Sequence, residues 1–201
     1  MSVLIFIDQS EGHVKKSSLE AMSYGAKIAE QLGTTAEGLV LGSSADDLAA
    51  LGKYGVKKIH HVNNATLDQL DAQLYTKVIA QVVEKTGATV VVFSNNMDGK
   101  AIAPRLSARL KAGLVSGAVA LPETGNGFTV KKNVFSGKAF ANISVGTPVK
   151  IISLNANAYK IVEGQGTAEV AAFDATIDTP RIKVTSTTKA SGEVPLTEAE
   201  I

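Results

Sequence analysis

Short apolar runs alternate with helix-like segments through the first half of the chain, and this alternation limits the possible folds most strongly. The runs predict strands at residues 3–7, 36–41, 58–62 and 89–93. Segments with apolar residues at helical spacing lie between and after them, at residues 16–32, 45–51, 68–85 and 102–110. Because parallel strands need crossover connections, the pattern predicts a mostly parallel sheet with helices on both faces.

Two details of this first half carry separate expectations. Residues 89–93 read as a fully buried strand, whereas residues 58–62 are expected to form a more exposed one. Pro104 lacks a backbone N–H and is unfavourable inside a helix. Either the last helix of this half begins near Ala103, with Pro104 in its first turn, or it is kinked there.

The second half of the chain has a different pattern. After Val115, short strand-like runs are separated by Gly, Pro and Asn, and the run "ETGNG" at residues 123–127 is typical of a hairpin turn. These runs predict mixed or antiparallel strands that extend the sheet. The predicted fold class is therefore α/β: a three-layer α/β/α arrangement with a doubly wound, mostly parallel sheet, extended by antiparallel strands in the C-terminal half.

The composition excludes several classes of function. A formal net charge of +1 gives no bias towards nucleic acids or acidic membranes, and the absence of cysteine excludes disulfides and thiolate metal sites. The N-terminus has no basic segment followed by a long apolar run, and no stretch reaches the roughly 18 apolar residues of a membrane span. We expect a cytoplasmic protein that binds no nucleic acid, has no stable membrane association, and borrows any redox cofactor.

The turn that follows residues 89–93 is a candidate anion site. Its sequence "SNNMDGKAIAPR" contains Asp98, which is suited to capping a helix, and two cations, Lys100 and Arg105. The alternative is that Asp98 and Gly99 form a turn and that the cations lie in solvent or against a partner. We favour the alternative, because a lone pair of Lys and Arg at a helix start is common on α/β proteins.

Residues after the first strand form a second candidate. Asp8, Gln9 and Ser10 lie where an open parallel sheet leaves a ligand crevice, and they are suited to contacting ribose or a metal. A solvated carboxylate at Asp8 is the favoured alternative. His60 and His61 are adjacent on a strand and point to opposite faces, so they do not share a metal. We therefore expect no catalytic, cofactor-binding or metal-binding residues in this chain.

Gly137 interrupts the strand pattern of residues 135–145. Glycine inside a strand usually marks a bulge or a close backbone approach. The first interpretation is a feature of sheet geometry alone. The second is a contact with a flavin-carrying domain or with another subunit.

Three segments together resemble a known family. The start "VLIFID", then "GKAIAPRLSARLKAGLVSGAVAL" at residues 99–121, and then "FSGKAFANISVGTPVKIISL" at residues 135–154 are similar to the electron transfer flavoprotein α subunit. A polar tract, "STTKASGEVP", follows them. The resemblance assigns residues 1–188 to the N-terminal α/β domain of that subunit and residues 189–201 to a linker towards an FAD-binding domain.

The resemblance implies a fold, a cofactor and partners. The fold is of the adenine nucleotide α-hydrolase-like type without an intact nucleotide loop. FAD is carried by the C-terminal domain, so none is expected on this chain, and AMP is bound by the partner β subunit of the heterodimer. Electrons pass from flavin dehydrogenases, such as the acyl-CoA dehydrogenases of fatty acid β-oxidation, towards the quinone pool. Lys100, Arg105 and Gly137 become expected interface contacts of a non-catalytic domain in the bacterial cytoplasm.

Two other functions stay open. One is a stand-alone adenine-nucleotide-binding protein, like the stress-protein relatives of the same superfamily. The other is a hydrolase or transferase of that superfamily, which would need a phosphate loop after the first strand. The sequence there, "DQSEGH", lacks the required glycines, so this function is the least favoured.

Overall fold

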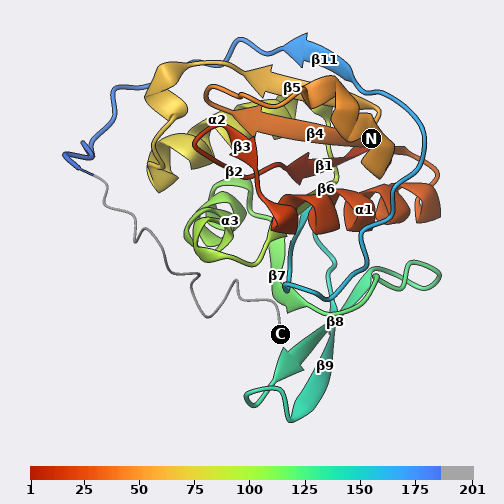
Figure 1. Cartoon of the computed structure of the whole chain (residues 1–201). Coiled ribbons are helices and arrows are strands. Elements are labelled where there is room, and N and C mark those ends of the chain that lie inside the picture. Colours follow the sequence, from red (N-terminus) through yellow and green to blue (C-terminus); the bar gives the residue numbers. More distant parts are fainter. Residues whose placement is uncertain (187–201) are drawn as a thin grey trace, which may run out of the picture.

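A nine-stranded sheet forms the centre of the molecule (Figure 1). The computed structural model describes residues 1–186, so the predicted linker at residues 189–201 lies outside the described residues. Along the sheet, the strands follow the order β11 (Glu169–Ala172), β5 (Lys58–Val62), β4 (Thr35–Leu41), β1 (Ser2–Phe6), β6 (Val90–Ser94), β10 (Lys150–Leu154), β7 (Gly113–Ala118), β8 (Thr129–Val134) and β9 (Ala139–Ser144).

Within this sheet, parallel pairing joins every strand from β11 to β7, and β7, β8 and β9 pair antiparallel. Two short strands, β2 (Gln9–Ser10) and β3 (His13–Val14), form a separate antiparallel pair. The predicted α/β class with a mostly parallel sheet and added antiparallel strands is thereby confirmed. The C-terminal half adds strands of both kinds. β10 inserts in parallel between β6 and β7, and β11 lies in parallel beside β5 at the far edge.

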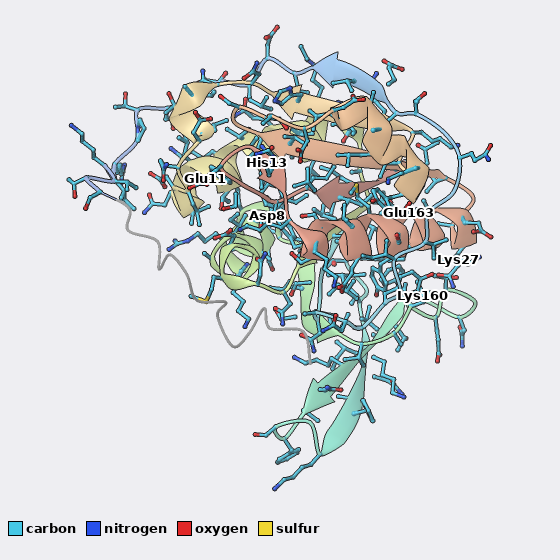
Figure 2. The ribbon with its side chains drawn as sticks, in the orientation of Figure 1. Asp8, Glu11, His13, Lys27, Lys160 and Glu163 are labelled. Atoms are coloured by element: carbon cyan, nitrogen blue, oxygen red, sulfur yellow. The ribbon has the colours of Figure 1, made fainter. Side chains whose placement is uncertain are left out.

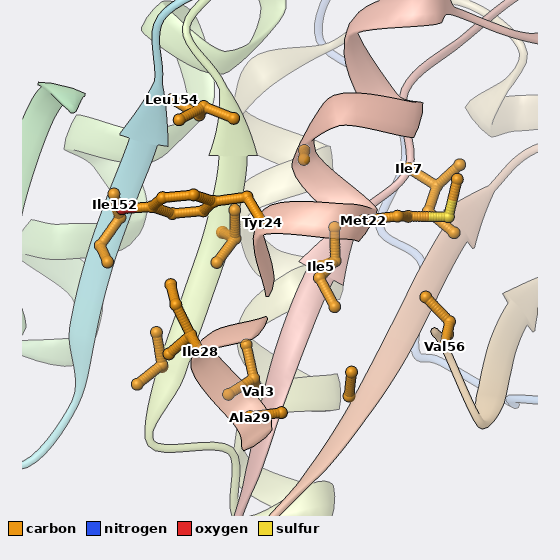
Figure 3. Packing of buried hydrophobic residues seen from close by; sticks show 14 of the residues in the cluster. Val3, Ile5, Ile7, Met22, Tyr24, Ile28, Ala29, Val56, Ile152 and Leu154 are labelled. Atoms are coloured by element: carbon orange, nitrogen blue, oxygen red, sulfur yellow. The ribbon is translucent and has the colours of Figure 1, made fainter. Parts of the chain in front are cut away.

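Helices cover both faces of the parallel part of the sheet. One face carries α1 (Lys16–Gln31) and the 3₁₀ segment η1 (Leu48–Tyr54), and the other carries α2 (Ala72–Thr86) and α3 (Met97–Leu110). Alternation along β1 explains the two cores, because Val3 and Ile5 pack with α1 while Leu4 and Phe6 pack with α2 and α3. Figure 3 shows Tyr24 and Ile28 of α1 lying against the strands of the first core.

Capping residues set the helix boundaries that periodicity alone misplaces. The helix predicted from residue 68 begins at Ala72, because the Asp71 carboxylate accepts hydrogen bonds from the N–H groups of Gln73 and Leu74. A further 3₁₀ turn, η2 (Ala65–Leu67), precedes it. The helix predicted at residues 45–51 is the 3₁₀ segment η1 instead, which begins after Asp47.

The third helix does not begin near Ala103, so the first expectation for Pro104 is wrong. α3 begins at Met97, well before Ala103, and Pro104 lies inside it on an exposed face. Solvent can supply the hydrogen bond that the proline removes there, which reduces the cost of the residue. Asp98 and Gly99 are helical, so the predicted turn at these residues is wrong.

The expected exposure of residues 58–62 is also wrong. Ile59, His60 and Val62 of β5 are buried. The reason is β11, which pairs with β5 and converts an edge strand into an interior one. The residues that form β11 come more than a hundred positions later, so local sequence could not reveal this cover.

The last two strands of the antiparallel part form a hairpin that projects from the body of the molecule (Figure 1). Gly137 lies in its turn with φ +84° and not inside a strand, so the predicted bulge or close approach is wrong. The φ angle is the physical reason for glycine at this position, because side chains are strained in the left-handed region. Phe135 and Ser136 share this turn with φ of 51° and 52°.

Candidate functional site

The carboxyl ends of β1 and β6 meet where the sheet changes its winding direction. From β1 the chain continues through β4 to β5 on one side, while β6 and β10 lie on the other. Loops leaving such strands diverge, and the crevice between them is the usual ligand site of an open parallel sheet. Asp8 follows β1, and Asn95 and Asn96 follow β6, so polar side chains do reach this crevice.

Four polar side chains join the two loops of the crevice. The Lys15 ammonium donates to the Asp8 carboxylate at 3.0 Å and to the Asp98 carboxylate at 2.7 Å. The Asn96 amide donates to Asp8 at 2.6 Å, and its oxygen accepts from the Gly99 N–H at 2.9 Å. We call Asp8, Lys15, Asn96 and Asp98 the crevice cluster. It ties the end of β1 to the starts of α1 and α3.

Burial and neighbouring charges of opposite sign shift the pKa values of the crevice cluster in opposite directions. Asp8 is 6% exposed, and this burial raises its pKa even though the Lys15 charge acts in the opposite direction. Burial by itself would lower the pKa of Lys15. The hydrogen bond to Asp98 and the charge of Asp8 outweigh it, so the pKa of Lys15 is raised. The lysine is thus held in its charged form between two carboxylates.

This arrangement opposes a phosphate at the start of α3. A helix N-terminus attracts anions through its unpaired N–H groups and its dipole. Here Asn96 already accepts from the Gly99 N–H, and Asp98 places a carboxylate in the first turn. Asp98 was the expected cap, but Asn96 fills that role. Since Asp8 adds a second negative charge, a phosphate would be repelled more strongly than the shared Lys15 could attract it.

The side chains of the two cations expected beside this turn have no hydrogen bond or ion pair with the crevice cluster. Lys100 and Arg105 are exposed on α3 and make no ion pair with any other residue of the range 1–186. Gly137 lies on a different element, at the tip of the β8–β9 hairpin. The structure therefore does not assemble Lys100, Arg105 and Gly137 into one site.

A pocket of about 540 Å³ lies beside the crevice cluster. Three loops form it: the one after β1, the one after β4, and the segment around η2. Its charged and polar lining consists of acids, amides and hydroxyls: Asp8, Gln9, Ser10, Glu11, Ser43, Ser44, Asp68, Gln69 and Tyr75. No lysine or arginine of the described chain lines this pocket, so it offers hydrogen bonds to a polar ligand but no cation for a phosphate.

The residues predicted for the crevice lie where they were expected, but the burial and bonding of Asp8 differ from the prediction. Asp8, Gln9 and Ser10 all line the pocket. The favoured interpretation of Asp8 as a solvated carboxylate is wrong, because Asp8 is buried and bonded to Lys15. Sequence analysis missed Lys15 itself. Its one signal is its position before the first helix, which brings it back to the edge where β1 ends.

Each histidine has a local partner in the fold. His60 contacts the Glu37 carboxylate at 2.7 Å, and this hydrogen bond lowers the pKa of Glu37. His61 contacts the Gly42 carbonyl at 2.8 Å, and His13 contacts Asp46 at 2.9 Å. His13 and Asp8 both belong to the segment between β1 and α1 (Figure 2). Among residues 1–186, no three His, Asp or Glu side chains are grouped so that they could hold a metal ion.

Several known proteins are similar to the chain, and two of the three described here are named as electron-transfer subunits. It is 28% identical over 144 residues to Protein FixB of Clostridium saccharobutylicum, which is 71% of this chain and 43% of that protein. It is 25% identical over 203 positions to the electron transfer flavoprotein subunit alpha of Bacillus subtilis, covering 99% of this chain and 62% of that subunit. It is 30% identical over 115 residues to the acryloyl-CoA reductase electron transfer subunit beta of Anaerotignum propionicum, covering 57% and 31%.

These matches cover only part of each relative. The chain spans less than two thirds of the length of each of these relatives. Within residues 1–186, no helix is both long and apolar enough to cross a membrane.

The electron transfer flavoprotein domain family matches residues 3–178, which is most of the chain and nearly all of the described fold. The chain belongs to the electron transfer flavoprotein domain family.

Proposed function

We propose that this chain is the N-terminal scaffold domain of an electron transfer flavoprotein α subunit. Residues 1–188 form the α/β domain, and residues 189–201 lead to a domain that binds FAD. The domain itself is non-catalytic and contributes the surface on which a β subunit and the FAD domain are assembled. The observation that carries the proposal is the crevice cluster, in which Asp8, Lys15 and Asp98 satisfy one another at the ligand edge of the sheet.

The rest of the proposed assembly is supported by the family resemblance alone. In this proposal, a β subunit of similar fold binds AMP and completes a heterodimer in the bacterial cytoplasm. The complete protein receives electrons from flavin dehydrogenases, such as acyl-CoA dehydrogenases, and passes them towards the quinone pool. Lys100 and Arg105 are proposed as contacts of α3 with the partner, because both cations are exposed and unpaired within the described chain. Gly137 is proposed as a contact of the hairpin turn.

Flavin absorbance tests this function directly. The 201-residue chain purified alone should be colourless, whereas co-expression with a β subunit and the remaining α segment should yield a complex with an FAD spectrum. The paired variant Lys100→Glu/Arg105→Glu should weaken the heterodimer, and the pair Lys57→Glu/Lys183→Glu, which makes the same change of charge at exposed positions outside α3, provides the control. Stoichiometric FAD on the 201-residue chain alone would contradict the proposal.

A stand-alone adenine-nucleotide-binding protein is the second candidate, and the 540 Å³ pocket is the observation that favours it. Its acidic lining argues against phosphate binding but leaves room for a nucleoside. Calorimetric titration with adenosine, AMP and ATP separates the two functions. Micromolar binding of adenosine, AMP or ATP would favour the second candidate, and no heat with any of the three would leave the scaffold proposal in place.

A further inference from the structure

We propose that strand β9 is a docking edge, which pairs with an extended, acidic segment of the β subunit by strand addition. This inference rests on the proposed function. It names the surface and the manner of contact, which the family match does not. The evidence comes from the backbone edge, the apolar exposure and the charge of the β8–β9 hairpin.

The outer edge of β9 lacks the usual protection. All six residues of β9 pair with β8 on one side, while the other side of the strand ends the sheet. Natural edge strands are commonly shortened, bulged, or supplied with lysine or proline, which blocks pairing with other chains. The β9 sequence "AFANIS" contains neither a charge nor a proline. The opposite edge, β11, has four residues, and its Glu169 pairs with Lys58 at 2.9 Å.

The register identifies which β9 groups face outward. Val145 N donates to Phe128 O at 2.8 Å, so the N–H at residue 145 points towards β8. Backbone groups alternate along an antiparallel ladder, which places the N–H groups of Ala141 and Ile143 on the same inner side. The N–H and C=O groups of Phe140, Asn142 and Ser144 then point to the open edge, as a pairing strand requires.

The hairpin also exposes more apolar surface than it needs for folding. Phe135 is 81% exposed, Phe140 60% and Ile143 38%, although they lie within nine residues of one another. No helix makes extensive contacts with β8 or β9 in the described chain. Phe140 and Ile143 project from opposite faces of β9, because side chains alternate along a strand, so both faces of the hairpin expose apolar side chains. A two-stranded ribbon of this kind is only marginally stable by itself and gains from a third strand.

The positive charge of the hairpin and its neighbouring segments, residues 124–162, favours an acidic partner. The sequence has no Asp or Glu between Glu123 and Glu163, whereas it has lysines at 131, 132, 138, 150 and 160. Lys131 lies over the Phe140 ring at 4.4 Å, and Lys132 and Lys138 form no ion pair within residues 1–186. A second copy of this chain would bring the same cations together and be repelled. An acidic partner strand would neutralise them.

Amide hydrogen exchange followed by NMR tests the docking edge. The probe is the electron transfer flavoprotein β subunit of the source organism, added to the intact 201-residue chain. In the free chain, the N–H groups of Phe140, Asn142 and Ser144 should exchange rapidly, and those of Ala141 and Ile143 more slowly. Binding should slow the three outward amides at least tenfold, with little change for the two inner ones.

A proline variant gives an independent measurement of affinity. Asn142→Pro removes an outward N–H while leaving the ladder to β8 intact, and should raise the Kd for the β subunit at least tenfold. Asn142→Thr keeps that N–H and should change the Kd less than twofold. NMR of residues 128–145 in the free Asn142→Pro variant shows whether the hairpin persists. Raising the NaCl concentration should weaken binding of the wild type.

The outcomes separate the inference from the proposed function. If the wild-type chain binds the β subunit but the outward amides are not protected, the docking edge is wrong and the scaffold function stands. If the wild-type chain does not bind the β subunit at all, both are overturned. If the outward amides become protected in the chain alone as its concentration rises, the occupant is a second copy, which also overturns the inference.

Discussion

The polar side chains of the crevice cluster at β1 and β6 have partners within the chain, whereas several polar groups of the β8–β9 hairpin have none in the described residues. In the crevice, Asp8 and Asp98 share the Lys15 charge, so the conventional ligand edge of the sheet is satisfied internally. On the hairpin, Lys132 and Lys138 have no ion-pair partner in the described chain, and the backbone of β9 is unpaired on one side. The comparison teaches that the charges of the crevice cluster are satisfied within the chain, whereas the hairpin offers unpaired cations and unpaired backbone groups to a partner.

Gly99→Ala should have the largest effect on the free energy of unfolding. It tests how rigid the crevice at β1 and β6 is. A Cβ at residue 99 would lie 1.9 Å from the Ser94 carbonyl oxygen, so α3 or the end of β6 would have to move. We expect the free energy of unfolding to fall by about 3 kcal/mol in urea denaturation. Gly146→Ala is the control, since nothing lies within 4 Å of its Cβ position. A loss below about 1 kcal/mol would mean that the crevice adapts easily.

Lys15→Met should have the next largest effect, because it leaves two carboxylates facing each other without a cation. Removing one partner of a fully buried pair costs roughly 3–5 kcal/mol, and the partial exposure of Lys15 reduces this to about 2 kcal/mol. Lys27→Met removes the exposed Lys27–Glu30 pair and should give no measurable change. Thermal unfolding of both variants measures the difference. Equal effects would show that the crevice cluster contributes no more than a surface pair.

The pH dependence of stability should have opposite signs at Asp8 and Glu37. Burial raises the pKa of Asp8 above its ordinary 3.8, so its protonated form favours the native state and its contribution is lost as pH rises through the raised value. The His60 hydrogen bond lowers the pKa of Glu37 below its ordinary 4.5, so its contribution is present above pH 4.5 and is lost as pH falls through the lowered value.

The variants Asp8→Asn and Glu37→Gln measure the contributions of these two carboxyl groups to the pH dependence of stability separately. We expect differences from wild type of up to about 1 kcal/mol for Glu37→Gln above pH 5, shrinking as the pH falls towards 3. The stability of Asp8→Asn relative to wild type should increase as the pH rises from 3 to 7. Urea denaturation at several pH values provides both profiles. Slopes of the same sign would contradict the two environments described for these carboxyl groups.

Phe140→Ala should have the smallest effect on folding. Phe140 is exposed on the hairpin, and its contact with Lys131 is a cation–π interaction at the surface, which contributes about 0.5 kcal/mol. Unfolding of the variant monitored by circular dichroism should therefore be close to that of the wild type. A loss as large as that of Lys15→Met would show that the hairpin belongs to the cooperative core and not to a free docking surface.

Local patterns predicted the parallel half of the fold but not all of its boundaries. The apolar runs that became β1, β4, β5 and β6 are long enough, and bounded clearly enough, to identify strands. Boundaries depended on caps, and the pattern did not distinguish Asn96 from Asp98 at the start of α3. Gly137 was assigned to a strand because the runs around it suit strands, whereas the φ angle that places it in a turn is not visible in periodicity.

The sequence by itself determined the α/β class, the family, and the lack of a glycine-rich phosphate loop, because these depend on local periodicity and short motifs. Only the tertiary structure decided that β10 enters between β6 and β7, that β11 covers β5, and that Lys15 meets Asp98 across 83 positions of sequence. Strand order and ion pairing are properties of contacts between distant segments. Their free energies depend on burial and distance, which the linear order of residues does not contain.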